Sequence, residues 1–265
     1  MSHDPQARFA FVSTPMQRRQ ALAWFGALAG AFISMPSWAQ DAIKRGGTLR
    51  IAAGANPSSL DPATGGSGYD HSYLWTLYDA LVDWDYETLR TRPGMAEFRF
   101  TNPKTLVLDI KPGITFHDGT PCDAAAVKFN LDRNRQDQRS NVKADLASVD
   151  AVEVTGPLQI TMKLKTPDVA IPAVLSDRAG MMVSPKAVQA LGNELDRKPV
   201  GAGPWKFVSW ADNQKVVVTR NDTYWRKGLP YMDGIEFSII TDQSTALRSV
   251  TAGQNDFVFA LSARY

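Results

Sequence analysis

Cysteine is almost absent from this sequence, since Cys122 is the only one among 265 residues. A single cysteine excludes an intrachain disulfide, and it also excludes a structural zinc site built from several cysteines. Cys122 stands beside a turn, and we interpret it as a small buried residue and not as a nucleophile. No metal and no cofactor is therefore predicted for this chain.

Dense runs of Lys and Arg are also missing. The chain has 29 Lys and Arg against 27 Asp and Glu, a formal net charge of +2. Residues 1–39 contain three Arg and one Asp, so this segment accounts for the whole net charge and the rest of the chain is neutral. A nucleic-acid-binding protein usually carries a basic stripe. No nucleic-acid partner is therefore expected.

The uncharged run near the start is too short to favour a membrane anchor. Residues 21–35 carry no charge, but this run is short of the roughly 20 apolar residues that span a bilayer. It follows Arg18 and Arg19 and precedes a small-x-small site that ends at Ala39. This order predicts a cleavable export signal over 1–39 and periplasmic residence. A membrane anchor is the alternative interpretation.

A strand, two turns and a helix start follow one another within residues 104–133. In a period-two pattern, Leu106, Leu108 and Ile110 alternate with Val107, Asp109 and Lys111, and the Pro-Gly pair at 112–113 ends that strand. The His-Asp-Gly sequence at 117–119 predicts a turn, because Gly accepts positive φ and Asp bonds its own backbone. Asp123 is placed to cap the following helix. The segment therefore reads as a rigid corner that fixes a helix against a sheet.

Similar spacings predict further elements along the chain. They are a strand at 49–51, a helix at 69–82, a hairpin of 149–154 with 158–164, a short helix at 167–175 interrupted by Pro172, a helix after Ser184, strands at 205–210 and 215–220, and a strand–helix–strand unit over 235–241, 244–252 and 256–259. We interpret the glycine-rich stretch 65–68 as a plain loop, since no Lys follows at phosphate-loop spacing; an anion nest is the alternative. The fold class predicted is α/β, with mixed sheets and flanking helices.

Residues 112–121 read Pro-Gly-Ile-Thr-Phe-His-Asp-Gly-Thr-Pro, which resembles the signature of the peptide/nickel-type extracellular solute-binding proteins. These are the capture subunits of ABC importers, and all the defined positions of their signature agree. Residues 200–205, Val-Gly-Ala-Gly-Pro-Trp, match a second family pattern in which Ala202 replaces the usual Thr. A departure is the Ala-Ala pair at 125–126, where the family usually has acidic residues.

The resemblance covers about residues 46–260 and implies a periplasmic-binding-protein-like fold. Members of the family have two lobes that close on a ligand, and they run well beyond this length. The resemblance therefore implies that residues 40–265 are the N-terminal lobe, truncated near the crossover, with the second lobe apparently missing. A true single-lobe binder is the alternative. The apolar strand at 257–259 is then expected to be poorly covered.

The function that the resemblance implies is non-enzymatic. It is capture of a peptide or related small solute in the periplasm, followed by delivery to the membrane permease of an ABC transporter. By analogy, the cleft residues expected to bind ligand are Asn56, Tyr69, Asp70, His71 and Arg178. Among them, Tyr69 is expected to stack on ligand, and Arg178 is expected to hold a carboxylate in a bidentate fork. The alternative is that these five are solvated surface residues.

Two other functions stay open from the sequence. A hydrolase would use His117 as a base that Asp118 orients, although neighbouring residues on a tight turn point apart. A truncated, inactive relic is the other possibility. One local prediction concerns Gly203, which precedes Pro204 in a bend where a side chain is expected to be costly. Gly203→Val is expected to cost more than about 1 kcal/mol if the φ of Gly203 is positive.

Overall fold

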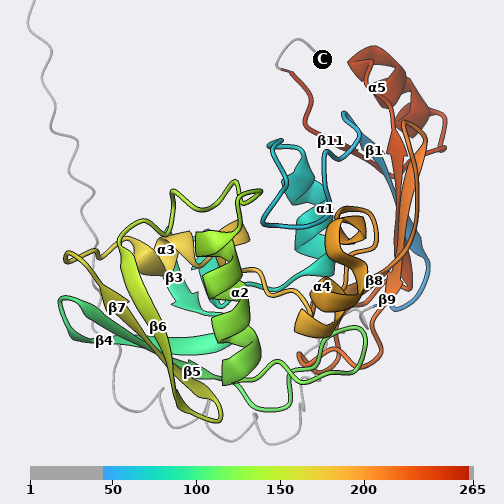
Figure 1. Ribbon diagram of the computed structural model, residues 1–265. Coiled ribbons are helices and arrows are strands. Elements are labelled where there is room, and N and C mark those ends of the chain that lie inside the picture. The colour runs from blue at the N-terminus through green and yellow to red at the C-terminus, as the bar shows by residue number, and fades with distance from the viewer. Residues whose placement is uncertain (1–43, 263–265) are drawn as a thin grey trace, which may run out of the picture. The chain divides into compact units, whose positions relative to one another are not determined.

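Residues 44–262 are described by this computed structural model, and they fold into β-sheets with helices packed on them (Figure 1). Within this range the sheets combine parallel and antiparallel pairing. The predicted α/β class with mixed sheets and flanking helices is therefore confirmed. The export signal predicted over 1–39 lies outside the described residues. Among the described helices, none is both long and apolar enough to cross a membrane.

The first sheet contains the first and the last strand of the described chain. Its strands lie in the order β11 (Phe257–Phe259), β1 (Thr48–Ala53), β10 (Gly234–Ile239), β9 (Lys215–Arg220) and β8 (Trp205–Ala211). The strands β11, β1 and β10 are parallel, while β9 and β8 are antiparallel to their neighbours. Four helices accompany this sheet: α1 (Asp70–Leu77), α4 (Pro185–Leu191), η2 (Gly192–Asp196) and α5 (Gln243–Thr251).

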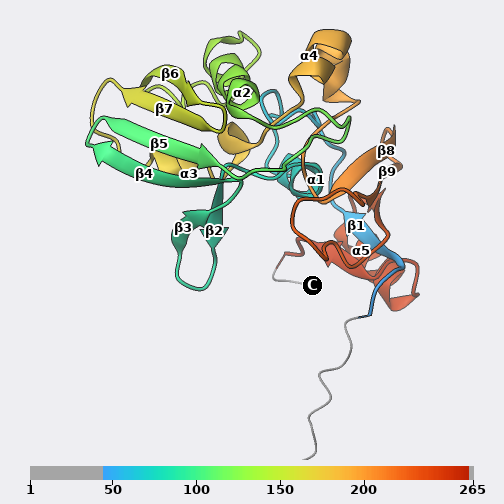
Figure 2. The ribbon, with the colours of Figure 1, turned by 90° about the horizontal axis from the view of Figure 1, so that it is seen from below.

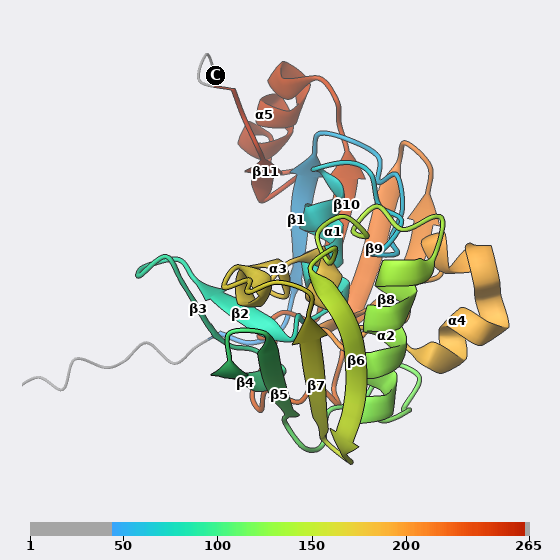
Figure 3. The same cartoon turned by 60° about the vertical axis from the view of Figure 1, so that its left-hand side comes forward.

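The second sheet is antiparallel. Its strands lie in the order β4 (Ala96–Asn102), β5 (Thr105–Ile110), β7 (Gln159–Leu164) and β6 (Val149–Gly156). Three helices belong to this part of the chain: α2 (Ala124–Gln136), α3 (Ile171–Val174) and η1 (Arg178–Gly180). Figure 3 shows α2 running beside β6, against the sheet. A hairpin of β2 (Val82–Asp85) and β3 (Arg90–Pro93) projects from this region (Figure 2).

The helix starts follow from local sequence. The side chains of Asp123, Ser184 and Asp242 accept hydrogen bonds from the backbone N–H three residues later, at 2.9, 3.2 and 2.8 Å. Each bond satisfies one of the N–H groups that the first turn of a helix leaves unpaired. The predicted cap at Asp123 and the predicted helix after Ser184 are therefore confirmed.

Two buried clusters form the core, one under each sheet, and three chain segments join them. Segment 77–82 contributes Tyr78 to the first cluster and Leu81 to the second. Segment 180–183 runs beside it, since the Gly180 carbonyl accepts from the Leu81 N–H at 2.9 Å. Segment 200–204 is the third, and the Gly203 N–H donates to the Leu77 carbonyl at 3.0 Å. The site described below depends on this joint because α1, which carries part of that site, ends there at Leu77.

The helix predicted at 69–82 is too long. In the structure α1 ends at Leu77, and Tyr78 takes an extended conformation. The reason is tertiary, because the backbone of segment 200–204 lies against Leu77 and leaves no room for another helical turn. The residues predicted as the end of that helix instead cross the joint and enter β2.

One further prediction needs correction. Pro172 does not interrupt a helix but stands in the first turn of α3, where no N–H is required. The expected cost of a side chain at Gly203 is confirmed, although the φ of Gly203 is not positive. Its requirement for glycine comes instead from close packing, since a Cβ there would lie 2.5 Å from the Leu77 carbonyl carbon and the Tyr78 nitrogen.

The apolar edge strand β11 is poorly covered, as predicted. Phe257 and Phe259 are 51% and 37% exposed, although both are large apolar residues. Within the described chain β11 pairs with β1 alone. Its outer edge therefore presents unpaired backbone groups beside two exposed rings.

Candidate functional site

The candidate site lies where the parallel strands of the first sheet end. Ala53, the last residue of β1, is in register with Ile239 of β10 and Phe259 of β11, so the three carboxyl ends meet at one edge. In open α/β sheets, ligands bind in the crevice outside the carboxyl ends of the strands. The loop over 54–69 starts at this edge and leads into α1.

Asp70 holds this loop together. Its side chain is fully buried, and its carboxylate accepts from the Ser58 N–H at 2.8 Å, the Ser58 hydroxyl at 2.6 Å and the Ser67 N–H at 3.0 Å. The Gly66 N–H donates in turn to the Ser58 hydroxyl at 3.0 Å. The N–H groups of Gly66 and Ser67 are thus already used inside the loop, which agrees with a plain loop and not with an anion nest.

Two adjacent residues of the second half of the chain, Asp177 and Arg178, bind this region: Asp177 contacts His71 and Arg178 contacts the loop. The ring of His71 lies with Nε2 2.9 Å from an Asp177 carboxylate oxygen and with Nδ1 3.2 Å from the Gly68 carbonyl. The Arg178 guanidinium donates to the Gly65 carbonyl. That is its one hydrogen bond among residues 44–262, so most of its five N–H donors are free to meet a ligand. Arg178 itself is half-buried.

Two exposed aromatic residues, Tyr69 and Trp75, lie within about one helical turn of His71 along the chain. Tyr69 is 41% exposed and packs over Gly54, where an added Cβ would lie 3.3 Å from its ring. Trp75 is 39% exposed and follows His71 by one helical turn, so both side chains share a face of α1. We define the Tyr69–Arg178 face as Tyr69, His71, Trp75, Asp177 and Arg178.

Trp75 and Asp177 were missed in the sequence. Helical spacing places Tyr73, Leu74 and Leu77 on the buried side of α1, and it therefore places Trp75 on the exposed side. An exposed Trp on a short helix is the signal that could have identified it. No such signal exists for Asp177, because its contact with His71 spans 106 positions of the chain.

Asn56 lies apart from the Tyr69–Arg178 face. Its amide oxygen accepts from the Trp210 indole N–H and from the Asn213 backbone N–H, both at 3.0 Å. It therefore fastens the beginning of the loop to the β8–β9 turn. The structure brings together Tyr69, Asp70, His71 and Arg178, and it places Asn56 at the opposite end of the same loop.

His117 and Asp118 do not form the dyad that a hydrolase would need. The Nδ1 atom of His117 accepts from the Gly201 N–H at 3.3 Å, so Nε2 carries the proton and donates to the Gly203 carbonyl at 3.1 Å. Asp118 instead accepts from the hydroxyls of Thr120 and Ser184, at 2.6 and 2.5 Å. The imidazole thus links the corner to segment 200–204 and is not oriented by Asp118. Among the described residues, no group of three possible metal ligands occurs either.

His117 is expected to make the fold sensitive to mild acid. Burial is the main cause that lowers the pKa of its imidazole, to about 4 from an ordinary 6.5. Between these two values the unfolded chain binds a proton that the folded chain does not, so stability falls as pH drops from about 6.5 to 4. The expected loss is about 3 kcal/mol, from roughly 1.4 kcal/mol per pKa unit.

Urea unfolding across this pH range, for the wild type and for His117→Gln, measures this effect as the difference between the two curves. His71→Gln is a matched control, because His71 is partly exposed and contacts Asp177 instead of segment 200–204. A pH profile of His117→Gln that parallels the wild type would show that His117 does not carry the effect.

Comparison with known proteins places the chain among solute-binding proteins. Residues 90–265 match the family model described as bacterial extracellular solute-binding proteins, family 5 middle. The glutathione-binding protein GsiB of Pectobacterium atrosepticum is 30% identical over 249 residues, covering 93% of this chain and 47% of that protein. The GsiB of Escherichia coli K12 is 30% identical over 217 residues, covering 80% of this chain and 42% of its own. The chain thus spans about half the length of the curated relatives it matches.

Solved structures share the fold. The oligopeptide-binding protein AppA of Bacillus subtilis, in complex with a nonapeptide, aligns with a TM-score of 0.75 at 24% identity, covering 81% of this chain and 44% of AppA. The periplasmic binding protein DppA of Helicobacter pylori, in complex with the peptide STSA, aligns with a TM-score of 0.73 at 24% identity, covering 80% and 46%. These likenesses confirm a periplasmic-binding-protein-like fold for the described residues.

Proposed function

Because this chain belongs to family 5 of the bacterial extracellular solute-binding proteins, we propose that it captures a peptide or related small solute in the periplasm and delivers it to the membrane permease of an ABC importer. The Tyr69–Arg178 face is the observation that supports this proposal. It combines exposed aromatic rings with a guanidinium that keeps free donors, at the strand edge where α/β sheets bind ligands.

Each group on this face has a distinct part in the proposed binding. Tyr69 and Trp75 offer flat apolar surfaces on which a solute can stack. Arg178 offers a fork of N–H donors that fits a carboxylate. Asp70 acts indirectly, because its buried carboxylate fixes the loop that carries Tyr69. Asn56 fixes the other end of the same loop.

The solute class follows from this chemistry and from the relatives. Glutathione, which names the GsiB relatives, and the peptides bound by AppA and DppA all carry a carboxylate and amide groups. The carboxylate is the feature that these ligands share, and we propose that it faces Arg178. Residues 40–265 would then act as the N-terminal lobe of such a protein, and capture would require no chemical step.

Periplasmic residence rests on the export signal proposed for residues 1–39. Cleavage after Ala39 would leave Gln40 as the first residue of the exported protein. Mass spectrometry of protein from the periplasmic fraction should therefore find a chain that begins at Gln40. Recovery of the intact Met1 end from that fraction would contradict this part of the proposal.

Calorimetry with reduced glutathione and with a free dipeptide tests the binding itself. We expect Arg178→Gln and Trp75→Leu to weaken binding at least tenfold, because each removes one contact that the solute makes. Arg248→Gln is the matched control, since Arg248 is an exposed Arg on α5 whose side chain is 70% accessible. It should bind as the wild type does.

Two results would count against capture at this face. A wild-type chain that binds neither probe would favour an inactive relic. Binding that survives both Arg178→Gln and Trp75→Leu would place the solute elsewhere on the protein. Far-ultraviolet circular dichroism and a melting curve for each variant separate lost binding from lost folding.

A further inference from the structure

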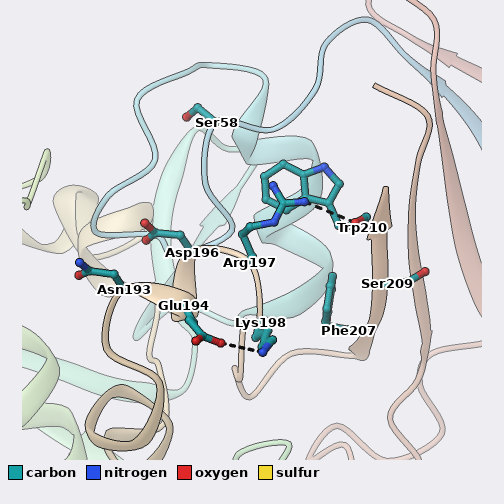
Figure 4. A pocket seen from close by; sticks show the side chains of 9 residues that line it. All are labelled: Ser58, Asn193, Glu194, Asp196, Arg197, Lys198, Phe207, Ser209 and Trp210. Atoms are coloured by element: carbon teal, nitrogen blue, oxygen red, sulfur yellow. Dashed lines mark hydrogen bonds and ion pairs between the residues drawn. The ribbon is translucent and has the colours of Figure 1, made fainter. Parts of the chain in front are cut away.

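A hollow of about 720 Å³ lies between η2 and the edge strand β8 (Figure 4). Its volume is in the range of about 300–1,000 Å³ that small-molecule sites occupy. No residue of the Tyr69–Arg178 face lines it. We call it the η2–β8 hollow, and the function proposed above makes no use of it.

A β-bulge aims an aromatic ring into this hollow. Phe207 of β8 pairs with Val218, but the next pairs are Ser209 with Val217 and Trp210 with Val216, so Val208 is an extra residue. Regular alternation would place Ser209 on the same face as Phe207. The bulge places Trp210 there instead, as bulges do when they redirect a side chain. The half-buried rings of Phe207 and Trp210 therefore form an apolar wall.

Charged residues of both signs line the hollow beside these rings, namely Glu194 and Asp196 with Arg197 and Lys198. The Arg197 guanidinium lies 3.8 Å from the centre of the Trp210 ring and is held there by Asp212 at 3.0 Å. Glu194 and Lys198 form an exposed ion pair at 2.7 Å on the rim. Figure 4 shows this pair below the Arg197 side chain.

The presence of both positive and negative side chains at the hollow favours ligands that carry both charges. A solute with a single charge sign would face at least one like charge across this small space. A solute that carries both signs meets a partner for each. The apolar wall adds a preference for a hydrophobic side chain between the two charges.

We propose that the η2–β8 hollow binds a short zwitterionic peptide. Its apolar side chain packs on Phe207, next to the Trp210 ring on which Arg197 is stacked. Its carboxylate faces Arg197 and Lys198, and its ammonium group faces Glu194. This site is separate from the Tyr69–Arg178 face and does not depend on the function proposed for it.

Nuclear magnetic resonance on the full chain tests this site directly, with leucylleucine as the probe. The Trp210 indole N–H signal, assigned by its loss in Trp210→Phe, is expected to shift in a saturable way. N-acetylleucylleucine amide has the same side chains without either charge, and it should bind at least tenfold more weakly. Phe207→Ala should also weaken leucylleucine binding at least tenfold.

Lys198→Gln provides a second test of the site in case Phe207→Ala fails to fold. The Lys198 side chain is 61% exposed, so its replacement should weaken binding several-fold without disturbing the core. Arg178→Gln should leave the Trp210 titration unchanged, which separates this site from the Tyr69–Arg178 face.

Three outcomes would overturn the proposal. The first is a Trp210 signal that does not move at millimolar leucylleucine. The second is a titration that Arg178→Gln abolishes while Phe207→Ala leaves it intact. The third is equal binding of the blocked and the free peptide, which would show that charge at the hollow selects nothing.

Discussion

Gly203→Val is expected to unfold the protein or to cost more than about 4 kcal/mol. A Cβ at Gly203 would lie 2.5 Å from both the Leu77 carbonyl carbon and the Tyr78 nitrogen. Both neighbours are backbone atoms, so no side-chain rotation relieves the clash. The joint between the two buried clusters would have to open, and each cluster would lose its fixed position against α1.

Gly201→Ala should have a comparable effect, because its Cβ would lie 2.1 Å from the Leu77 carbonyl oxygen. Gly68→Ala is the matched control. Gly68 has nothing within 4 Å of an added Cβ and no positive φ, so we expect a change within about 1 kcal/mol. Urea denaturation midpoints measure all three variants. A midpoint of Gly203→Val equal to that of Gly68→Ala would show that the joint accommodates a side chain at position 203 without a loss of stability.

Arg133→Leu is expected to cost about 3–5 kcal/mol, because it leaves a buried carboxylate without its cation. The Arg133 guanidinium donates to both carboxylate oxygens of Asp61, one of them at 3.1 Å. The Asp61 side chain is 1% exposed and the Arg133 side chain 10%. The pair also ties α2 of one half to the loop that carries the Tyr69–Arg178 face. Thermal and urea unfolding measure the loss.

Two variants separate the buried charge from the loss of a long side chain. Adding Asp61→Asn to Arg133→Leu should recover part of the loss, since an uncharged amide costs less to bury. Arg248→Leu removes an Arg whose nearest carboxylate is 3.9 Å away at an exposed site, and it should cost less than about 1 kcal/mol. A double variant less stable than Arg133→Leu would contradict this account.

The sequence by itself determined the local features of the fold and the family. The His-Asp-Gly turn and the cap at Asp123 depend on residues close together in the chain, so their physical causes can be read from the sequence. The family followed for the same reason, because its motifs are short contiguous runs around such turns. The five site residues proposed from the sequence came from that resemblance and not from any local pattern.

Tertiary structure decided everything that depends on distant segments. It ended α1 at Leu77 and explained Gly203 by contact instead of by φ, because segment 200–204 occupies the space beyond that helix. It buried the Asp70 carboxylate against the loop that precedes α1. It also brought Asp177 into contact with His71, which lies 106 positions earlier in the chain. Long-range packing determines which polar groups form hydrogen bonds within the fold and which remain free to bind a ligand. No periodicity or short motif in the sequence predicts this division.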